Sequence, residues 1–367
     1  YWPLHMKQEI YKPSFLFFSR LIGAILAPFY LILNLFRIRK SFQEDIIKTI
    51  LVTEYHRIGD VLMIAPALKA LKEHFKDAQL ILLCSSAAAS LARDLQLADE
   101  VIVFDAPWTT WSFSPFKWIK ARSFARSFSK RKINLAIDFK GDIRNSWFLW
   151  HMKSEHSLGY TTTGGGYFFS RTFLFPFEMH QTERALHLVS KIGAKPVMSM
   201  ETKWAVKKGG YIVLHPGTID SRRGWPLHHW IALINTLTTD FELAIVRTKE
   251  SVELVEAVKK NNLAVYIFEG NIVQFKNWLQ VQRLLIAPDS MAGHLAAYLK
   301  IPVISLFGAQ NPELTKPLGD KIIVVNPGKE CVHQRDHWRL CSSCMSAINP
   351  ESVLDSAVNL LRYNYGK

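Results

Sequence analysis

The pair Gly59-Asp60 places a carboxylate where proteins of the α/β class carry out chemistry. It follows an apolar run at residues 50–52 and precedes a run with helical spacing, so the stretch predicts a strand, a tight turn and the start of a helix. Gly59 lets the backbone turn, and first-turn amides can hold a carboxylate or a substrate anion. Open α/β sheets bind substrates at the carboxyl ends of their strands. The same pattern is also typical of an aspartate that only caps its helix.

A second turn of this kind lies in the other half of the chain. Asp289 and Ser290 follow the apolar run at residues 284–287, and His294 stands about one helical turn further on. Backbone amides at such a turn can bind phosphate oxygens. His294 also fits an ordinary packing histidine. The glycines at residues 164–166 are not a phosphate loop, because the Lys-Ser/Thr of a P-loop does not follow them.

Three of the four cysteines, Cys331, Cys341 and Cys344, lie close together, with His333 and His337 between them. This content is typical of a metal site, but the spacing is irregular for structural zinc, and a packed loop of reduced thiols fits as well. We therefore predict no metal and keep the three cysteines as weak candidates. Four cysteines are too few for a secreted disulfide framework, which favours a reducing compartment.

Two series of strand-like runs alternate with helical ones. The runs lie at residues 50–53, 80–84, 100–104 and 135–137, and again at residues 211–214, 241–246, 284–287 and 303–307. Such alternation predicts βαβ units and parallel sheets, and a chain of 367 residues suggests about two domains. We predict an α/β fold in which two Rossmann-like domains face each other across a cleft that binds the ligands.

The domain boundaries are predicted where each pattern stops. We expect an apolar and basic membrane-associated segment at residues 1–45, a first Rossmann-like domain at residues 46–200, a second at residues 201–348 and a closing helix at residues 349–367. The stretch at residues 197–210 is polar and basic without a strong period, which predicts the linker there.

The apolar stretch at residues 14–36 is interrupted by Arg20, Pro28 and Asn34, and a basic cluster at residues 37–40 follows it. Its uncharged part is shorter than the roughly 20 residues of a spanning helix. We predict a helix in the membrane interface, whose cations contact anionic headgroups. A single span, a cleaved signal peptide and a core helix are the alternatives.

The net charge of +14 and the pI near 9.5 indicate an anionic partner. Nucleic acid, acidic lipid and phosphorylated small molecules satisfy this charge equally. A basic helix with an aromatic side, predicted at residues 117–132, fits either a membrane surface or solvent. Because the sequence has no helix-turn-helix, zinc-finger or RNP signature, we predict no nucleic-acid partner.

An ordered set of short motifs over residues 49–361 resembles the bacterial ADP-heptose:lipopolysaccharide heptosyltransferase family. After RIGD at residues 57–60, the set continues with HPGT at 215–218, RGWP at 223–226, DS at 289–290 with HLAA at 294–297, and PV through LFG at 302–308. The resemblance implies a GT-B fold and an inverting, metal-independent glycosyltransferase without a cofactor. The second domain would bind the nucleotide sugar, and the first would bind the acceptor.

The resemblance also implies roles for individual residues. Asp60 corresponds to the general base. The donor-binding residues would be Thr218, Arg222, Arg223, Glu250, Asp289, Ser290, Gly293 and His294, and the acceptor-binding residues Gly59, Lys140, Arg144 and His180. Lys140 and Arg144 are also compatible with ordinary surface cations.

The chain departs from the family's usual residues at three places. Arg223 stands where relatives usually have lysine, Met291 replaces a glycine, and Arg247-Thr248 replaces a glycine pair near the nucleoside. These changes leave the donor open, so the function predicted is transfer of a heptose or related sugar, most simply from ADP-heptose, to a lipid-linked saccharide of the lipopolysaccharide type. The expected place is the cytoplasmic face of the inner membrane. A UDP- or GDP-sugar enzyme of O-antigen or capsule synthesis is one alternative, and a non-catalytic, membrane-tethered sugar-nucleotide-binding protein is another.

Overall fold

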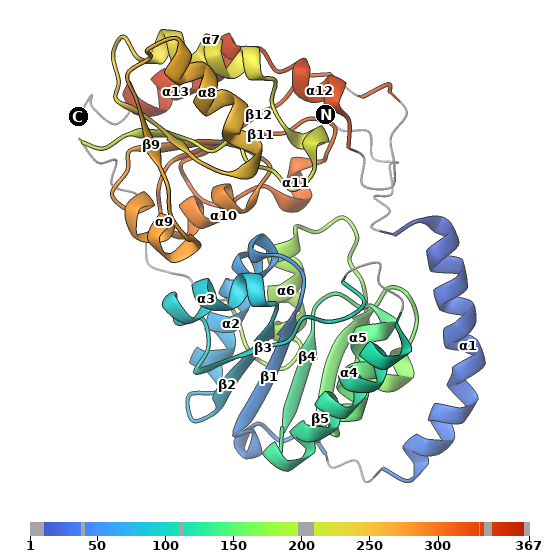
Figure 1. The fold of residues 1–367 in the computed structure, drawn as a ribbon. Coiled ribbons are helices and arrows are strands. Elements are labelled where there is room, and N and C mark those ends of the chain that lie inside the picture. The colour runs from blue at the N-terminus through green and yellow to red at the C-terminus, as the bar shows by residue number, and fades with distance from the viewer. Residues whose placement is uncertain are drawn as a thin grey trace. The chain divides into compact units, whose positions relative to one another are not determined.

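The computed structural model describes residues 11–37, 41–109, 114–196, 209–329, 331–333 and 340–362. The chain divides into two compact units, one of which covers Lys7–Met198 while the other includes Ser199–Lys367 (Figure 1). Most of the linker predicted at residues 197–210 lies outside the described residues.

The first unit is built on a parallel sheet in the order β3-β2-β1-β4-β5-β6. Its strands are β1 (Thr49–Glu54), β2 (Gln79–Cys84), β3 (Glu100–Val103), β4 (Leu135–Asp138), β5 (His156–Thr161) and β6 (Arg171–Leu174). Its helices after the first are α2 (Ile58–His74), α3 (Ser86–Asp94), α4 (Pro115–Ser127), α5 (Ile143–Met152) and α6 (Gln181–Ser190), with 3-10 turns η1 (Glu44–Ile46), η2 (Phe128–Arg131) and η3 (Gly166–Phe168).

Both faces of this sheet are covered by helices. Alternate residues of β1 enter different cores: Val52 packs with α2, α3 and α6, whereas Leu51 packs with α4 and α5. Because both faces are buried, β1 is apolar at successive positions rather than alternating. The result is a three-layer unit in which β1 and β4 are central.

The second unit has the strand order β12-β11-β10-β7-β8-β9. Its strands are β7 (Ile212–Leu214), β8 (Leu243–Val246), β9 (Val265–Phe268), β10 (Leu284–Pro288), β11 (Val303–Leu306) and β12 (Ile322–Val325). Its helices are η4 (Ser221–Arg223), α7 (Leu227–Leu237), η5 (Lys249–Ser251), α8 (Val252–Lys260), α9 (Ile272–Leu279), α10 (Met291–Tyr298), α11 (Pro312–Thr315), α12 (Ser342–Ser346) and α13 (Pro350–Arg362). Helices α7, α8 and α13 share one core, and α9 and α10 lie on the other side of the sheet (Figure 1).

The two sheets have the same topology. If the strands of each unit are counted from its own first strand, both orders become 3-2-1-4-5-6, which is the Rossmann order. The strand order reverses between strands 1 and 4, that is, between β1 and β4 in one unit and between β7 and β10 in the other. Loops at the carboxyl ends of these four strands are therefore where ligands are expected. The prediction of two Rossmann-like domains is confirmed.

Helix α1 (Pro13–Leu35) packs on the first unit through the polar residues that interrupt its apolar sequence. Asn34 accepts a hydrogen bond from Trp150 Nε1 (2.9 Å) and donates one to the Tyr167 carbonyl (2.7 Å). The Arg20 guanidinium donates to the Thr162 carbonyl at 3.2 Å. These contacts hold one side of α1 against α5 and η3 (Figure 1).

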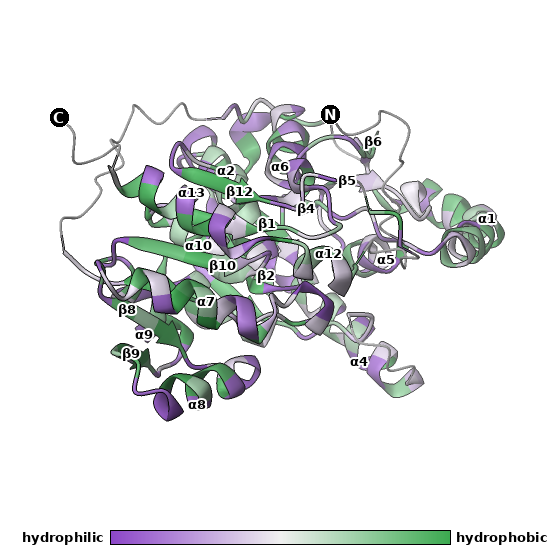
Figure 2. Cartoon of the chain, turned by 90° about the horizontal axis from the view of Figure 1, so that it is seen from above, coloured by the Kyte–Doolittle hydropathy of each residue, from purple (hydrophilic) through white to green (hydrophobic). Residues whose placement is uncertain are grey.

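The other side of α1 is a row of exposed, large apolar side chains. Phe17, Ile25 and Phe29 are 64%, 68% and 59% exposed. The helix is long and apolar enough to cross a membrane by composition, but only 11% of its most apolar stretch is buried. Figure 2 shows this mainly hydrophobic helix at the margin of its unit. The alternative of a core helix is therefore wrong.

Candidate active site

Asp60 caps its own helix and also joins a polar cluster. It occupies the third position of α2, where its Oδ2 accepts a hydrogen bond from the Arg57 backbone N–H at 3.2 Å. Its Oδ1 accepts from Lys140 Nζ at 2.6 Å and from Gln181 Nε2 at 2.7 Å. These two donors come from the loop after β4 and from the first turn of α6. Asp60 can therefore cap α2 and also act as a site residue.

Lys140 lies between two carboxylates. Its Nζ is 3.3 Å from Glu54 Oε2 in addition to its contact with Asp60, and the Glu54 side chain is completely buried at the end of β1. The other oxygen of Glu54 is 2.9 Å from His56 Nδ1. A buried carboxylate is costly unless it is paired, so Glu54 holds Lys140 beside Asp60.

These charges control the ionisation of both partners. Burial tends to raise the pKa of Asp60, but the charges of Lys140 and His56 and its hydrogen bonds outweigh burial, and this pKa lies well below its usual range. Burial tends to lower the pKa of Lys140, but Asp60 and Glu54 outweigh it, so the lysine pKa is raised. Asp60 is therefore an ionised carboxylate near neutral pH.

The loop that carries Lys140 is shaped by a buried acid. Asp138, at the end of β4, accepts hydrogen bonds from the Gly141 N–H and from Asn145, both at 2.9 Å. Burial raises the pKa of Asp138 to about 6. Gly141 has φ +69°, and a Cβ there would lie 2.9 Å from the Tyr160 carbonyl oxygen, so only glycine fits this turn.

Helix α6 supplies the other face of the Asp60 cluster. The buried His180 caps this helix, because its Nδ1 accepts a hydrogen bond from the Thr182 N–H at 3.1 Å. His180 thereby positions Gln181 and, one turn later, Arg184. Burial lowers the pKa of Arg184 to about 10, so its charge remains at neutral pH and acts on Asp60 and Lys140.

Arg144 belongs to a different cluster. Its guanidinium forms a two-pronged ion pair with Asp142, with nitrogen to oxygen distances of 2.8 and 2.6 Å. Its Cζ lies 5.1 Å from the centre of the Phe15 ring on α1, and the Tyr11 hydroxyl donates to Asp142 at 3.2 Å. Arg144 therefore joins the loop after β4 to the start of α1, whereas Lys140 joins the same loop to Asp60.

In the second unit, Arg223 and Asp289 form the central contact. Arg223 Nη1 is 3.0 Å from Asp289 Oδ2, and both side chains are largely buried. The amide of Gln310 contacts both when its oxygen accepts from Arg223 Nη2 at 3.1 Å and its nitrogen donates to Asp289. The three residues come from η4 and from the loops after β10 and β11, at the carboxyl edge of the sheet.

Two buried polar atoms beside this contact have no hydrogen-bond partner among the described residues. They are Arg223 Nε and the hydroxyl of Ser290, which is the N-cap residue of α10. Gly293 and the half-buried His294 follow Ser290 on this helix. A buried polar atom without a partner is costly, and a bound anion could receive hydrogen bonds from both groups.

Arg222 and Thr218 flank the same loop. Arg222 forms a two-pronged ion pair with Asp220, at 2.9 and 2.7 Å, and the Thr218 hydroxyl donates to the Asp220 carbonyl at 2.8 Å. A small cavity lies here, lined among others by Arg222, Arg223, Asp289, Gln310, Cys341 and Met345.

Glu250 is exposed on η5, next to the loop after β7. A Cβ on Gly217 would lie 2.8 Å from Thr248 Oγ1, so the loops after β7 and β8 approach each other closely. Burial lowers the pKa of His215 to about 4, although the charge of Glu250 opposes this shift. His215 is therefore neutral at pH 7, and Glu250 is the nearby charged group.

The family model described as glycosyltransferase family 9 (heptosyltransferase) matches residues 121–341, which is more than half of the chain. The chain belongs to this family. The resemblance predicted from the short motifs is confirmed, and the protein is a glycosyltransferase.

Two relatives and two solved structures show the extent of the likeness. Lipooligosaccharide heptosyltransferase 2 from two strains of Campylobacter jejuni is 23% and 22% identical, over 84% and 83% of this chain and 97% and 96% of the relative. The E. coli heptosyltransferase WaaC with ADP has a TM-score of 0.67 at 17% identity, over 85% of this chain and 99% of that one. The E. coli ADP-heptose lps heptosyltransferase II has a TM-score of 0.68 at 15% identity, over 87% and 100%.

For this glycosyltransferase family 9 member, sequence reasoning missed Gln181 and Glu54. Glu54 ends β1, so the rule that ligands bind at strand ends was a sufficient signal for it. Gln181 stands in the helix that His180 caps, but only the fold brings it to Asp60. The roles of the predicted site residues remain predictions.

Proposed function

We propose that the protein transfers a heptose from ADP-heptose, with inversion and without a catalytic metal, to a lipid-linked acceptor of the lipopolysaccharide type. Two findings support the donor and the acceptor: the Campylobacter relatives are named lipooligosaccharide heptosyltransferase 2, and WaaC has been solved with ADP and with ADP-2-deoxy-2-fluoro heptose. The observation that carries the proposal is the Asp60 carboxylate, which is held ionised by Lys140 at the carboxyl end of the Rossmann sheet.

Asp60 acts as the general base in this proposal. It accepts the proton of the acceptor hydroxyl while that oxygen bonds to the anomeric carbon and the bond from this carbon to the diphosphate breaks, so that ADP leaves. Gln181 and Lys140 both donate to Oδ1, which fixes the carboxylate and weakens its basicity. An anionic acceptor group that draws Lys140 toward itself raises the pKa of Asp60 at the moment when a base is needed.

The second unit binds the departing diphosphate in this proposal. The unpaired Nε of Arg223 and hydroxyl of Ser290 are donors available to phosphate oxygens, and α10 adds the amides of its first turn. Arg222 adds a second cation, because it lines the same small cavity as Arg223. Hydrogen-bond donors whose positions are fixed before the reaction stabilise the negative charge on a leaving group best.

A panel of donors tests this function. ADP-heptose is expected to stabilise the protein in a thermal-shift assay by about 2.7 kcal/mol at 100 times its dissociation constant, and to support transfer to a heptose-deficient lipopolysaccharide. UDP- and GDP-sugars at the same concentrations serve as the matched comparison. A larger shift and faster transfer with one of them would favour the alternative donor, which Met291 and Arg247-Thr248 keep open. Binding without transfer or hydrolysis would favour the non-catalytic alternative.

We propose that the exposed side of α1 lies in the anionic interface of the cytoplasmic face of the inner membrane. Its polar contacts with Trp150 and Thr162 hold the helix on the first unit, while its apolar row faces outward. A helix anchored in this way fits an interfacial position better than a span. Phe116 and Ile119 of α4, 77% and 64% exposed, are further exposed apolar side chains of the same unit.

Replacing Phe17, Ile25 and Phe29 together by serine is expected to weaken binding to anionic vesicles at least tenfold. These side chains are more than half exposed, so their loss leaves the fold intact while removing apolar contact with lipid. Sedimentation with phosphatidylglycerol vesicles measures the change. Leu174→Ser, at an 87% exposed position on β6, is the control. Equal sedimentation of all forms would contradict the proposed interfacial helix.

A further inference from the structure

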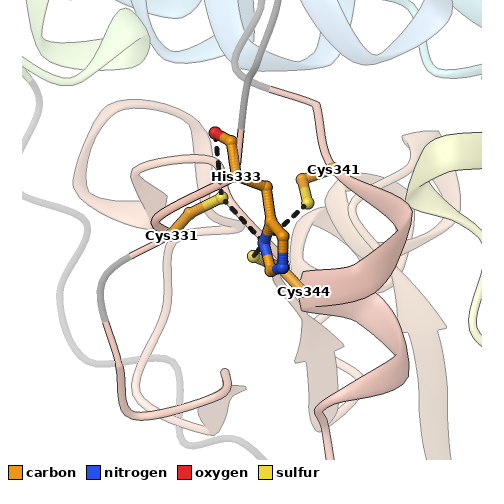
Figure 3. A group of neighbouring side chains, drawn as sticks. All are labelled: Cys331, His333, Cys341 and Cys344. Carbon is orange, nitrogen blue, oxygen red and sulfur yellow. Dashed lines mark hydrogen bonds between the residues drawn. The ribbon is translucent and has the colours of Figure 1, made fainter.

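Three cysteines and one histidine of the second unit converge on one point. Their ligand atoms all lie within 4.8 Å of one another. Cys331 and His333 come from the segment after β12, and Cys341 and Cys344 from the first turn of α12. Figure 3 shows the imidazole of His333 turned toward the three sulfurs. His337, the other histidine of the motif, lies outside the described residues.

The distances match a tetrahedral metal site. His333 Nδ1 is 3.7, 3.5 and 4.0 Å from the sulfurs of Cys331, Cys341 and Cys344. A tetrahedral zinc ion with bond lengths near 2.3 Å to sulfur and 2.1 Å to nitrogen sets a nitrogen to sulfur distance of about 3.6 Å. The observed distances surround this value, and none of the three cysteines is in a disulfide.

The pattern of spacing and burial also suits a metal. Cys341 and Cys344 form a C-x2-C pair at a helix start, which is a spacing that zinc sites use. The three cysteines are 8%, 8% and 6% exposed, whereas His333 is exposed and covers them from the solvent side. Among the described residues these three cysteines share a small core only with Ala309, so little apolar packing holds the segment in place.

We propose that Cys331, His333, Cys341 and Cys344 bind one zinc ion with a structural role. Four protein ligands complete the tetrahedral shell and leave no position for a substrate, unlike the open site of a catalytic zinc. The ion therefore takes no part in sugar transfer. It links the segment after β12 to α12.

This link fixes one wall of the cavity beside Arg222 and Arg223. Cys341 and Met345 line that cavity, and α12 contacts η4, which carries both arginines. A Cβ on Gly308 would lie 2.9 Å from Met345 Sδ, so α12 also packs closely against the loop after β11. Loss of the ion frees α12 and loosens this wall.

Metal analysis of the full-length protein tests the site directly. About one zinc per chain is expected by elemental analysis after purification from zinc-supplemented cells and a brief chelator wash. His333→Ala and Cys344→Ala are expected to lose it, whereas His333→Cys, which restores a fourth ligand, retains it. His228→Ala, at an exposed position on α7, and Cys84→Ala, in β2 of the other unit, are the matched controls.

Cobalt spectra keep the test valid where a cysteine variant folds poorly. Cobalt(II) added to the metal-free wild type is expected to give thiolate charge-transfer bands and the intense visible bands of a tetrahedral site, and His333→Cys should shift them. The proposal would be overturned if cobalt(II) added to the metal-free protein gave no such bands. It would also be overturned if His333→Ala retained as much zinc as the wild type, or if the purified protein held another metal in place of zinc.

The expected effect of zinc on ADP binding rests on the proposed function, whereas the expected zinc content does not. The metal-depleted protein is expected to bind ADP more weakly and to regain affinity when zinc is restored. Zinc that is bound without any effect on ADP would leave the metal site standing and refute its link to the cavity. If neither the metal-depleted nor the zinc-restored protein bound ADP, this result would count against the donor assignment instead.

Discussion

Asp60→Asn is expected to lower kcat by about 10²–10⁴-fold, the range typical for loss of a general base. Asparagine keeps the size of the side chain, and its one amide oxygen can still accept a hydrogen bond from Gln181, but it cannot accept the proton of the acceptor hydroxyl. Donor affinity is expected to stay unchanged, because the proposed diphosphate contacts come from the second unit. A transfer assay with ADP-heptose, together with ADP binding by calorimetry, measures both quantities.

The fold is expected to survive this substitution. Lys140 keeps the buried Glu54 as a partner at 3.3 Å, so no buried charge is left alone. Glu183→Gln is the matched control, because Glu183 is another acid in the first turn of a helix and is exposed on α6. Turnover by Asp60→Asn within a few-fold of the wild type would refute the assignment of Asp60 as the base.

Lys140→Met tests how the ionisation of Asp60 determines the pH dependence of the reaction. Removal of Lys140 leaves burial as the dominant effect on the pKa of Asp60, so this pKa rises and the acid limb of the kcat/KM profile moves to higher pH. In the wild type this pKa is lowered, so the stability that it contributes is present above the unfolded pKa, near 3.8, and is lost only as pH falls toward the folded value. Lys72→Met, which removes an exposed partner of Asp99, should leave the profile unchanged.

The sequence was sufficient to predict where the Asp60 cluster forms, but not which residues complete it. Asp60 and Lys140 each follow a strand, and the Rossmann order sets β1 beside β4, so their approach follows from topology alone. Gln181 lies 121 residues from Asp60 and follows no strand. Its approach depends on how α6 packs against α2, which depends on side-chain shapes along both helices.

Arg144 and α1 show how neighbouring residues change an interpretation. Three residues separate Lys140 from Arg144, and the family resemblance gave them the same role, but Asp142 between them forms an ion pair with Arg144. In α1, Arg20 and Asn34 interrupt the apolar run and thereby argue against a span. The structure shows their positive role, since both hydrogen-bond to the first unit. Sequence patterns report polarity, but they do not identify the partner of a polar side chain.

Arg223→Met is expected to lower kcat/KM by about 10²–10³-fold, the cost of removing one fixed donor from a developing negative charge. Arg223 is the residue that links the carboxyl edges of β10 and β11 through Asp289 and Gln310, and its Nε is left for a ligand. Because the charge on the diphosphate grows as the sugar leaves, kcat is expected to fall more than ADP affinity. Steady-state kinetics and ADP calorimetry separate the two effects.

Arg223→Lys separates charge from geometry, since family relatives usually have lysine at this position. The lysine keeps the positive charge but loses the planar fork that can contact Asp289 and a phosphate together. We expect it to recover most of the ADP affinity and only part of kcat. Arg131→Met, which removes an exposed arginine paired with Glu100 in the first unit, is the control for loss of positive charge. If Arg223→Met and Arg131→Met lowered kcat/KM equally, the effect would come from net charge, and the donor site would have to lie elsewhere in the second unit.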